Sequence, residues 1–350
     1  MERIAAVRAS LSRSLPPGTR TSESPSFSAS DSKRILDLKP RSSIQNPKPK
    51  ILSNTPFRFG HVALVGKPNV GKSTLLNRIV GQKVSIVSNK PQTTRRKALG
   101  IANGDGWQVA FVDTPGIHDP HTRLGRSMVD QARSGLADVD VAVYVADGSH
   151  HPGEMDKQIA EMLKANPQKV PLIVCLNKMD LLKAENVERN VNAYTELFGT
   201  EEYMLTTATK GENVDRLMEL IVAHLPEAAP QYGEDEFTDQ TSRFLAAELV
   251  REKILHATRD EVPHSVAVLI DSWDEEETPL RIEASILVEK ASQRGILIGK
   301  GGQFLKNIGT KAREDIEEIL GQKVFLALHV KVAEGWRQNP RMLAELDYRD

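Results

Sequence analysis

Three short motifs in the sequence combine residue types that suit phosphate and base recognition. The first brackets four residues between two glycines and then adds Lys and Ser, as Gly66-Lys67-Pro68-Asn69-Val70-Gly71-Lys72-Ser73. Such glycines let backbone amides turn toward phosphate oxygens, the Lys72 ammonium can reach the β- and γ-phosphates, and the Ser73 hydroxyl can ligate Mg²⁺. The motif therefore predicts a nucleoside triphosphate site, with Thr74 beside it in the first turn of a helix.

Asp113-Thr114-Pro115-Gly116 is the second motif, and it follows the apolar run 109–112. A carboxylate at this place can hold Mg²⁺ through a water molecule, and the Gly116 amide can reach a γ-phosphate, so its position would depend on whether that phosphate is present. Taken alone, the four residues would favour a simple β-turn. After a phosphate loop they predict a nucleotide-dependent switch.

The third motif places Asn177, Lys178 and Asp180 at the end of the apolar run 172–176. A carboxylate can accept hydrogen bonds from N1–H and from the exocyclic amine of guanine, and adenine offers no such pair. Further along, the run Thr207-Ala208-Thr209 can bring a backbone amide to guanine O6, with Thr207 where GTPases usually have serine. Together the motifs predict that the chain binds GTP and GDP with Mg²⁺.

Ile117 follows the second motif, at the position where many GTPases have a glutamine that orients the attacking water. An isoleucine side chain has no hydrogen-bonding group and cannot do this. The sequence therefore predicts slow intrinsic hydrolysis, with the water positioned by backbone, by the switch or by a partner. His118 and Asp119 come next and could act as a general base, but solvated loop residues are the favoured interpretation.

The motifs need elements that hold them together. From Phe59 to about Pro226, helical stretches such as 73–80 alternate with apolar runs at 61–65, 109–112, 141–146, 172–176 and 203–206. This alternation predicts an α/β fold of the P-loop kind, a mostly parallel sheet covered by helices on both faces. Because ligand loops then lie at the carboxyl ends of the strands, where the motifs are, we predict a GTP-binding domain over 58–226.

A different pattern begins after residues 227–241, whose prolines, glycine and acidic run predict a linker. Apolar residues at steps of three and four predict a helix over 246–257, and strand patterns follow at 266–270, 282–288 and 324–332. We therefore predict an α+β domain over 242–345.

Between the second and third of these strands lies a glycine-rich loop, Gly299-Lys300-Gly301-Gly302, that would join two helices. Such a loop lets a nucleic-acid backbone approach closely while an apolar floor receives unstacked bases. The order helix, strand, strand, helix, loop, helix, strand resembles a type II KH domain. We predict RNA contacts at Ile298, Gly299, Lys300, Gly301, Gly302 and Lys306.

Composition agrees with a chain of more than one domain. The 350 residues include a single cysteine, Cys175, which excludes a disulfide framework and lies within an apolar run. No apolar run is long enough to span a bilayer, so any membrane contact would be peripheral. The formal charge is −1, and residues 51–350 alone carry −7, so a nucleic-acid role must depend on a local basic patch.

Residues 1–57 carry little apolar periodicity and read as a disordered extension. The first fifty hold eleven Ser and ten Lys or Arg against four acidic residues. Such a composition is compatible with a transit peptide to a plastid or mitochondrion. Glu2 and Glu23 weaken that interpretation, and a flexible bacterial extension or a start codon assigned too far upstream is favoured.

Over about 58–345 the chain resembles the Era family, TrmE-Era-EngA-like translational GTPases with a C-terminal KH domain. The likeness rests on the three nucleotide motifs and on 91–95, Arg251-Glu252-Lys253, Asp260-Glu261-Val262-Pro263, 296–302 and Trp336-Arg337. It implies an assembly factor that binds the 3′ end of small-subunit ribosomal RNA and switches with nucleotide state. It also implies that Thr94, rather than Thr93, closes onto Mg²⁺, and that the protein is a cytoplasmic monomer with loose contact to the inner membrane face.

Two other classes of protein compete with this interpretation. A GTPase fused to an RNA-modifying enzyme would need a second catalytic cluster, and the sequence of 227–350 shows no metal-ligand cluster or nucleophile with a neighbouring base. A passive RNA-binding protein with a degenerate nucleotide site would lack Lys72, Ser73 or Asp180, which are all present. The sequence favours the switching GTPase.

Overall fold

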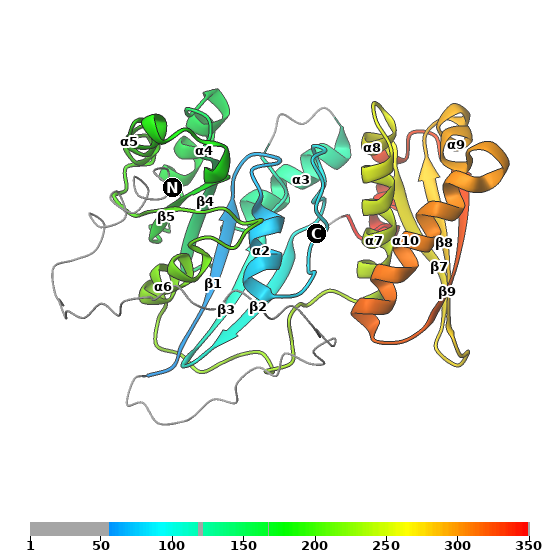
Figure 1. Ribbon diagram of the computed structural model, residues 1–350, viewed down its shortest axis with the longest axis horizontal. Helices are drawn as coiled ribbons and strands as arrows, with labels where there is room; N and C mark the ends of the chain where they lie inside the picture. Colours follow the sequence, from blue (N-terminus) through cyan, green and yellow to red (C-terminus); the bar gives the residue numbers. More distant parts are fainter. Residues whose placement is uncertain (1–55, 118–121, 167, 349–350) are drawn as a thin grey trace, which may run out of the picture. The chain divides into compact units, whose positions relative to one another are not determined.

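Two β-sheets organise the chain in a computed structural model, which describes residues 56–117, 122–166 and 168–348 (Figure 1). The described residues belong to one compact unit, Pro56–Asp350. The predicted extension 1–57 lies outside the described residues except for Pro56 and Phe57, and so do His118 and Asp119. None of the described helices is long and apolar enough to cross a membrane.

The first sheet has six strands in the order β2-β3-β1-β4-β5-β6. All neighbours are parallel except β2 and β3, which form an antiparallel pair. The strands are β1 (Arg58–Val65), β2 (Ala98–Gly104), β3 (Trp107–Asp113), β4 (Val141–Asp147), β5 (Leu172–Asn177) and β6 (Tyr203–Leu205). The mostly parallel sheet predicted from the sequence is confirmed, and β2 is an addition to it.

Helices cover both faces of this sheet, because successive strand residues point to opposite sides. Val62 and Leu64 of β1 pack in one apolar cluster with α2 and α6, while Ala63 and Val65 pack in another with α4 and α5. The helices are α2 (Lys72–Val80), α3 (Arg123–Ser134), α4 (Glu154–Lys164), α5 (Val187–Phe198) and α6 (Val214–His224), with short 3₁₀ turns at Met179–Leu181 and Ala184–Asn186.

The second sheet has three strands, β7 (Ala267–Asp274), β8 (Leu280–Val288) and β9 (Val324–Val332). β8 is antiparallel to β7 and parallel to β9. The helices are α7 (Ser242–Ala257), α8 (Val262–Ser265), α9 (Ala291–Ile298) and α10 (Gln303–Leu320), followed after β9 by the 3₁₀ turn η4 (Trp336–Gln338) and α11 (Pro340–Glu345). Apart from the short α8, the order of elements is the one predicted for a KH domain.

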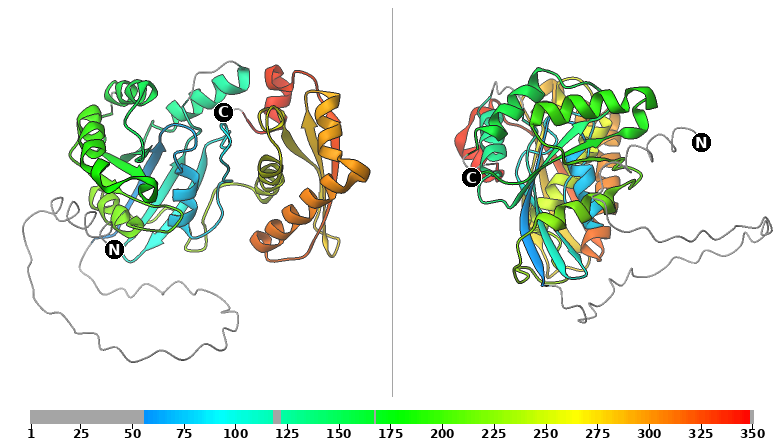
Figure 2. Two further views of the ribbon diagram at one scale, coloured as in Figure 1. Left: turned by 45° about the horizontal axis from the view of Figure 1, so that its top comes forward. Right: turned by 90° about the vertical axis from the view of Figure 1, so that its left-hand side faces the viewer.

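The two sheets are connected by more than the covalent chain. Leu124 and Met128 of α3 are fully buried in an apolar cluster with Trp336, Leu343 and Tyr348, which lie after β9. In Figure 2 the C-terminal segment, drawn in red, lies beside α3. We call residues 242–348, which include the second sheet and its helices, the KH-like part. The shared core helps to fix the KH-like part against the first sheet.

Residues 227–241 follow the edge of the first sheet. Ile101 N–H donates to Phe237 O at 2.9 Å, and the buried Gln108 side chain accepts from the backbone N–H of Gln231 and Tyr232 at 2.9 and 3.0 Å. Gln108 Nε2 also donates to Tyr232 O at 2.9 Å. One glutamine on β3 thus satisfies three backbone groups of this stretch.

We predict that Gln108→Ala lowers the free energy of unfolding by about 2 kcal/mol, because it leaves three part-buried backbone groups of Gln231 and Tyr232 without this partner. Urea unfolding of the full-length protein and of the variant would measure this difference in the free energy of unfolding. Gln231→Ala is the matched control, since that side chain is exposed and only its backbone takes part. Equal midpoints for Gln108→Ala and the parent protein would contradict the prediction.

Candidate functional site

The loop between β1 and α2 carries the first sequence motif at the carboxyl end of the sheet. Its two glycines are required because atoms of β4 and β5 lie too close to allow a side chain at either position. A Cβ on Gly66 would lie 2.2 Å from Val145 O, and a Cβ on Gly71 would lie 2.3 Å from Asn177 Nδ2. Gly71 also has a φ of 102°, which L side chains rarely adopt. The loop is therefore held against β4 and β5 with no room for larger residues.

The N-terminus of α2 faces this loop without a side-chain cap. Its N-cap, Gly71, supplies no side-chain hydrogen bond, so the first amides of the helix are available to an anion. The buried Lys72 ammonium donates to Gly66 O at 2.9 Å and to Lys67 O at 3.0 Å. Burial lowers the pKa of Lys72 to about 8, against the opposing attraction of Asp113, so the side chain is largely cationic at neutral pH.

Two hydroxyls and a carboxylate meet beside Lys72. Ser73 Oγ donates to Asp113 Oδ2 at 2.8 Å and lies 2.9 Å from Thr94 Oγ1. Asp113 is fully buried, and its Oδ1 has no hydrogen-bond partner among the described residues. Burial raises the pKa of Asp113, while Lys72 opposes this shift. Hard oxygen donors with an unpaired carboxylate oxygen fit Mg²⁺.

The second motif continues from Asp113 toward the phosphate loop. Thr114 is buried and its hydroxyl donates to Leu64 O at 2.8 Å, which fixes the motif to β1. A Cβ on Gly116 would lie 2.7 Å from Pro68 N, so Gly116 is packed against the phosphate loop. The Ile117 side chain packs on the apolar cluster of α4 and α5. It is therefore directed into apolar surroundings.

Asn177 links the phosphate loop to the loop after β6. Its Nδ2 donates to Val70 O at 2.9 Å, and its Oδ1 accepts from Ala208 N–H at 2.9 Å and from the Thr206 hydroxyl at 3.3 Å. The Ala208 amide, which sequence reasoning assigned to guanine O6, is thus already bonded to Asn177. A contact with guanine would share or replace this bond.

The other residues of the third motif surround Asn177. Lys178 has a φ of 62°, and its ammonium donates to Asn69 O at 2.6 Å and Asp147 Oδ2 at 2.9 Å. The Asp180 carboxylate lies 3.5 Å from Lys210 Nζ and is partly exposed, so it remains accessible to a ligand. Thr209 is exposed, whereas Thr207 Oγ1 is buried with no partner in the described part of the chain.

Several supporting residues have no sequence motif that would have revealed them. Arg78 on α2 donates to Ala208 O and Thr209 O at 3.2 and 2.6 Å, which ties the guanine-side loop to α2. Lys67 pairs at 2.8 Å with the buried Asp156 of α4. The Tyr144 hydroxyl donates to the same carboxylate. Each of these contacts joins residues far apart in the sequence.

A pocket lies over the phosphate loop and brings together most of the predicted phosphate and metal residues. Ile117, Asn177 and Asp180 are not part of its lining. The segment between α2 and β2 closes one side of it, and Gly116 another. The lining residues are Pro68, Asn69, Gly71, Lys72, Ser73, Thr74, Ile86, Val87, Ser88, Gln92, Thr93, Thr94 and Gly116.

The glycine-rich loop lies between α9 and α10 as predicted. Gly299, Gly301 and Gly302 have φ values of 70°, 60° and 77°. A Cβ on Gly299 would also lie 2.6 Å from Phe304 Cβ, whereas Gly301 and Gly302 face open space. Lys300, which lies between Gly299 and Gly301, is exposed. The backbone here is free to approach another chain closely.

An open groove of about 560 Å³ runs from this loop between α10 and β9. Of the six residues predicted to contact RNA, Gly302 and Lys306 line this groove, and Ile298, Gly299, Lys300 and Gly301 do not. The apolar floor comes from residues that the sequence analysis did not assign to RNA contact: Leu305, Phe325, Leu326 and Leu328. Arg281 lies over the exposed Phe325 ring at 5.2 Å. The groove thus combines apolar surface with positive charge.

Comparison with known proteins finds a matching family for each of the two parts of the chain. A family described as a 50S ribosome-binding GTPase matches residues 61–178, and a KH domain family matches residues 261–337. GTPase Era of Heliobacterium modesticaldum is 46% identical over 295 residues, which cover 83% of this chain and 97% of that protein. The chain belongs to the Era family. It is therefore a GTPase with a C-terminal KH domain.

Solved Era structures share the architecture over the same region. Era in complex with MgGDPNP and nucleotides 1506–1542 of 16S ribosomal RNA matches with a TM-score of 0.80 and 41% identity, covering 84% of this chain and 100% of that one. A variant of Aquifex aeolicus Era bound to GDP·AlF₄⁻ matches with the same TM-score, identity and coverage. The sequence-based recognition of the Era family is confirmed.

We predict different consequences for two residues of the Era-family guanine motif. Asn177→Ala should lower the free energy of unfolding by about 2–4 kcal/mol in the absence of nucleotide, because Val70 O and Ala208 N–H lose buried partners. Asp180→Ala should weaken guanine nucleotide binding with little change in stability, because its side chain is partly exposed. Urea unfolding and GDP titration of both variants would check this. Equal loss of stability in the two would contradict it.

Proposed function

We propose that the protein binds GTP with Mg²⁺ at the end of β1, hydrolyses it, and uses the nucleotide state to control its hold on small-subunit ribosomal RNA. The observation that carries this proposal is the meeting of Ser73, Thr94 and Asp113 at the N-terminus of α2. Thr94 comes from the segment between α2 and β2, so the site includes a part of the chain that can respond to the ligand.

The residues of the phosphate side have distinct roles in this proposal. The amides of 66–74 and the Lys72 ammonium hold the β- and γ-phosphates, and the Gly116 amide contacts the γ-phosphate. Ser73 and Thr94 are the direct ligands of Mg²⁺, with Asp113 acting through water. A Mg²⁺ ion held there would bridge phosphate oxygens and neutralise the negative charge that develops on them.

Guanine specificity is assigned to the loops after β5 and β6. We infer that the Asp180 carboxylate accepts from N1–H and the exocyclic amine, while Asn177, Lys178 and 207–209 enclose the base. Support comes from Asn177, which joins the phosphate loop to the Ala208 loop and so fixes the distance between the two halves of the site. Replacing guanine by adenine would leave a carboxylate unpaired.

The groove between α10 and β9 is the proposed RNA site, within a KH domain at 242–345. The matched Era structure holds nucleotides 1506–1542 of 16S ribosomal RNA, and we assign RNA of the same kind, the 3′ end of the small-subunit RNA, to this groove. The glycine loop would take the backbone, with Lys300 and Lys306 beside it, and the apolar floor would receive unstacked bases. The role that follows is assembly of the small ribosomal subunit.

Cellular context belongs to the same proposal. We place the protein in the cytoplasm as a monomer, and the bacterial origin of its Heliobacterium relative supports this location. Peripheral contact with the inner membrane face is implied by the family resemblance alone. Fractionation of cells at low and high salt, followed by immunodetection of the full chain, tests the cytoplasmic location and the membrane contact.

We predict that Lys300→Asp combined with Gly301→Asp abolishes binding of RNA that ends in the small-subunit 3′ sequence and leaves GTP affinity unchanged. Filter binding over a range of salt concentrations would measure it, and Lys300→Asp alone should reduce the salt slope by about one. Lys311→Asp is the matched control, because Lys311 is exposed on the face of α10 away from the groove. Equal losses of RNA and GTP binding would remove the assignment.

We predict that intrinsic GTP turnover stays below about 1 s⁻¹, under the median of about 10 s⁻¹ for enzymes, because the Ile117 side chain packs against an apolar cluster and has no group that could orient the attacking water. Single-turnover hydrolysis should accelerate when small ribosomal subunits are added, with co-sedimentation on those subunits but not on mature ribosomes. Fast turnover of the purified protein would contradict the first part. Hydrolysis indifferent to the subunits would contradict the second.

A further inference from the structure

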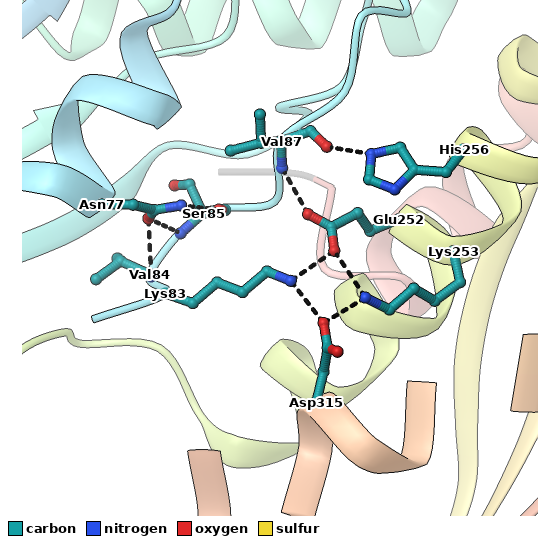
Figure 3. Close-up of polar contacts among 9 residues, drawn as sticks. All are labelled: Asn77, Lys83, Val84, Ser85, Val87, Glu252, Lys253, His256 and Asp315. Carbon is teal, nitrogen blue, oxygen red and sulfur yellow. Dashed lines mark hydrogen bonds and ion pairs between the residues drawn. The ribbon is translucent and has the colours of Figure 1, made fainter. Parts of the chain in front are cut away.

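The segment between α2 and β2, which carries Thr94, is held at three places by residues beyond position 240. The first is shown in Figure 3, around the buried carboxylate of Glu252 on α7. Glu252 accepts from Val87 N–H at 2.8 Å and from Lys83 Nζ at 2.6 Å. Lys83 also reaches Asp315 of α10 at 2.7 Å, and His256 donates to Val87 O at 2.7 Å.

The second place is immediately before Thr94. Arg251 of α7 is fully buried, and its guanidinium donates to Thr93 O while pairing with the Glu248 carboxylate one turn earlier on the same helix. The Tyr348 hydroxyl donates to the same carboxylate at 3.3 Å. The carbonyl that precedes Thr94 is thus fixed by a charged group of the KH-like part.

The residue immediately after Thr94 is fixed in a similar way. Arg95 is fully buried and donates to Val266 O at 2.7 Å and to Pro263 O at 3.3 Å. Its guanidinium lies 5.6 Å from the ring centroids of both Trp336 and Tyr348. Burial lowers the pKa of Arg95 to about 10, with a further contribution from the charge of Arg251, so it stays cationic at neutral pH.

This arrangement is not the one that stability alone would favour. Arg251 pairs with the Glu248 carboxylate, whose charge also acts on Arg95, and within the described residues Arg95 Nε and Arg251 Nη1 are buried without hydrogen-bond partners. Apolar residues of similar volume often stabilise such a position as well or better. Unsatisfied buried groups in a native fold call for an explanation other than stability. Both arginines bind next to Thr94, whose hydroxyl lies 2.9 Å from Ser73 Oγ, so the position of this hydroxyl is such an explanation.

We propose that Arg251 and Arg95 are positioning residues for GTP hydrolysis, which hold Thr94 from both sides so that its hydroxyl lies beside Ser73. The KH-like part then contributes to the GTPase site even though neither arginine touches Thr94's hydroxyl. This inference rests on the proposed roles of Thr94 and Ser73 at Mg²⁺.

A double-mutant cycle in the full-length protein tests the proposal, with Arg251→Met, Thr94→Ala and their combination. Single-turnover hydrolysis at saturating GTP should fall about tenfold with Arg251→Met, while GDP affinity changes less than about twofold. In the Thr94→Ala background the same replacement should have no further effect, because residues that act through one group are not additive. Arg251→Lys should restore part of the rate.

Arg96→Met is the matched control. Arg96 is the next residue, and it pairs with Asp347 of the C-terminal stretch at a partly exposed position, so it reports on general loosening between the two parts of the chain. Its hydrolysis rate should stay within about twofold of the parent protein. If Arg251→Met fails to fold by thermal unfolding, Glu248→Gln replaces it, since this change keeps the arginine and removes the carboxylate that orients it.

The possible outcomes separate the inference from the proposed function. Equal rate losses from Arg251→Met with and without Thr94, or a parallel loss of GDP affinity, would overturn the positioning role while leaving the GTPase intact. A Thr94→Ala variant that hydrolyses GTP at the parent rate would overturn it as well. Absence of hydrolysis in the parent protein, even with small ribosomal subunits, would instead overturn the proposed function.

Discussion

The uncapped N-terminus of α2 is the constraint on which the rest of the structure depends. Helix amides without side-chain partners, a buried lysine and a buried aspartate are costly to bring together in one place without a ligand of matching charge. The surrounding chain offsets this cost with local contacts of Lys72 to the carbonyls of its own loop, and with long-range contacts of Asn177 and Lys178 to Val70 and Asn69. The carboxyl ends of β1, β3 and β5 therefore have to meet at this helix.

The sequence motifs outside the nucleotide site acquire a physical meaning from the contacts between the two parts of the chain. Arg251, Glu252 and Lys253 are three consecutive residues of α7, and each makes an ion pair or hydrogen bond that involves the segment 83–97 or α10. Pro263 O accepts from Arg95, and Trp336 lies against the Arg95 guanidinium. Lys253 acts through Asp315, which also binds Lys83 of this segment. All of these residues therefore help to fix the position of the segment that contains Thr94.

Local patterns predicted most of the elements, and long-range pairing accounts for what they missed. The parallel strands are nearly continuous apolar runs, so β1, β3, β4 and β5 were evident, and regular alternation revealed β9. β2 (Ala98–Gly104) was missed because its Gly and Asn residues disfavour strands, and it is held instead by antiparallel pairing with β3. Arg78, Gln108 and Asp156 could not be found from sequence for the same reason, because each binds partners far along the chain: 130 and 131 residues away for Arg78, 123 and 124 for Gln108, and 89 for Asp156. The groove floor around Phe325 was likewise set by the packing of α10 on β9.

Ile117 and the arginine pair lead to one conclusion about the switch. Since the Ile117 side chain packs against an apolar cluster and has no polar group, the proposed function leaves the attacking water to be ordered by backbone, by the segment that carries Thr94 or by a partner. That segment is held by α7, and through Lys83 by α10, which begins at Gln303 directly after the glycine loop. Lys253 adds a second contact to the same Asp315. Any movement of α10 relative to the first sheet must therefore strain or release the contacts of Lys83. In the proposed function, helix packing and these ion pairs would thus connect the groove to the nucleotide site.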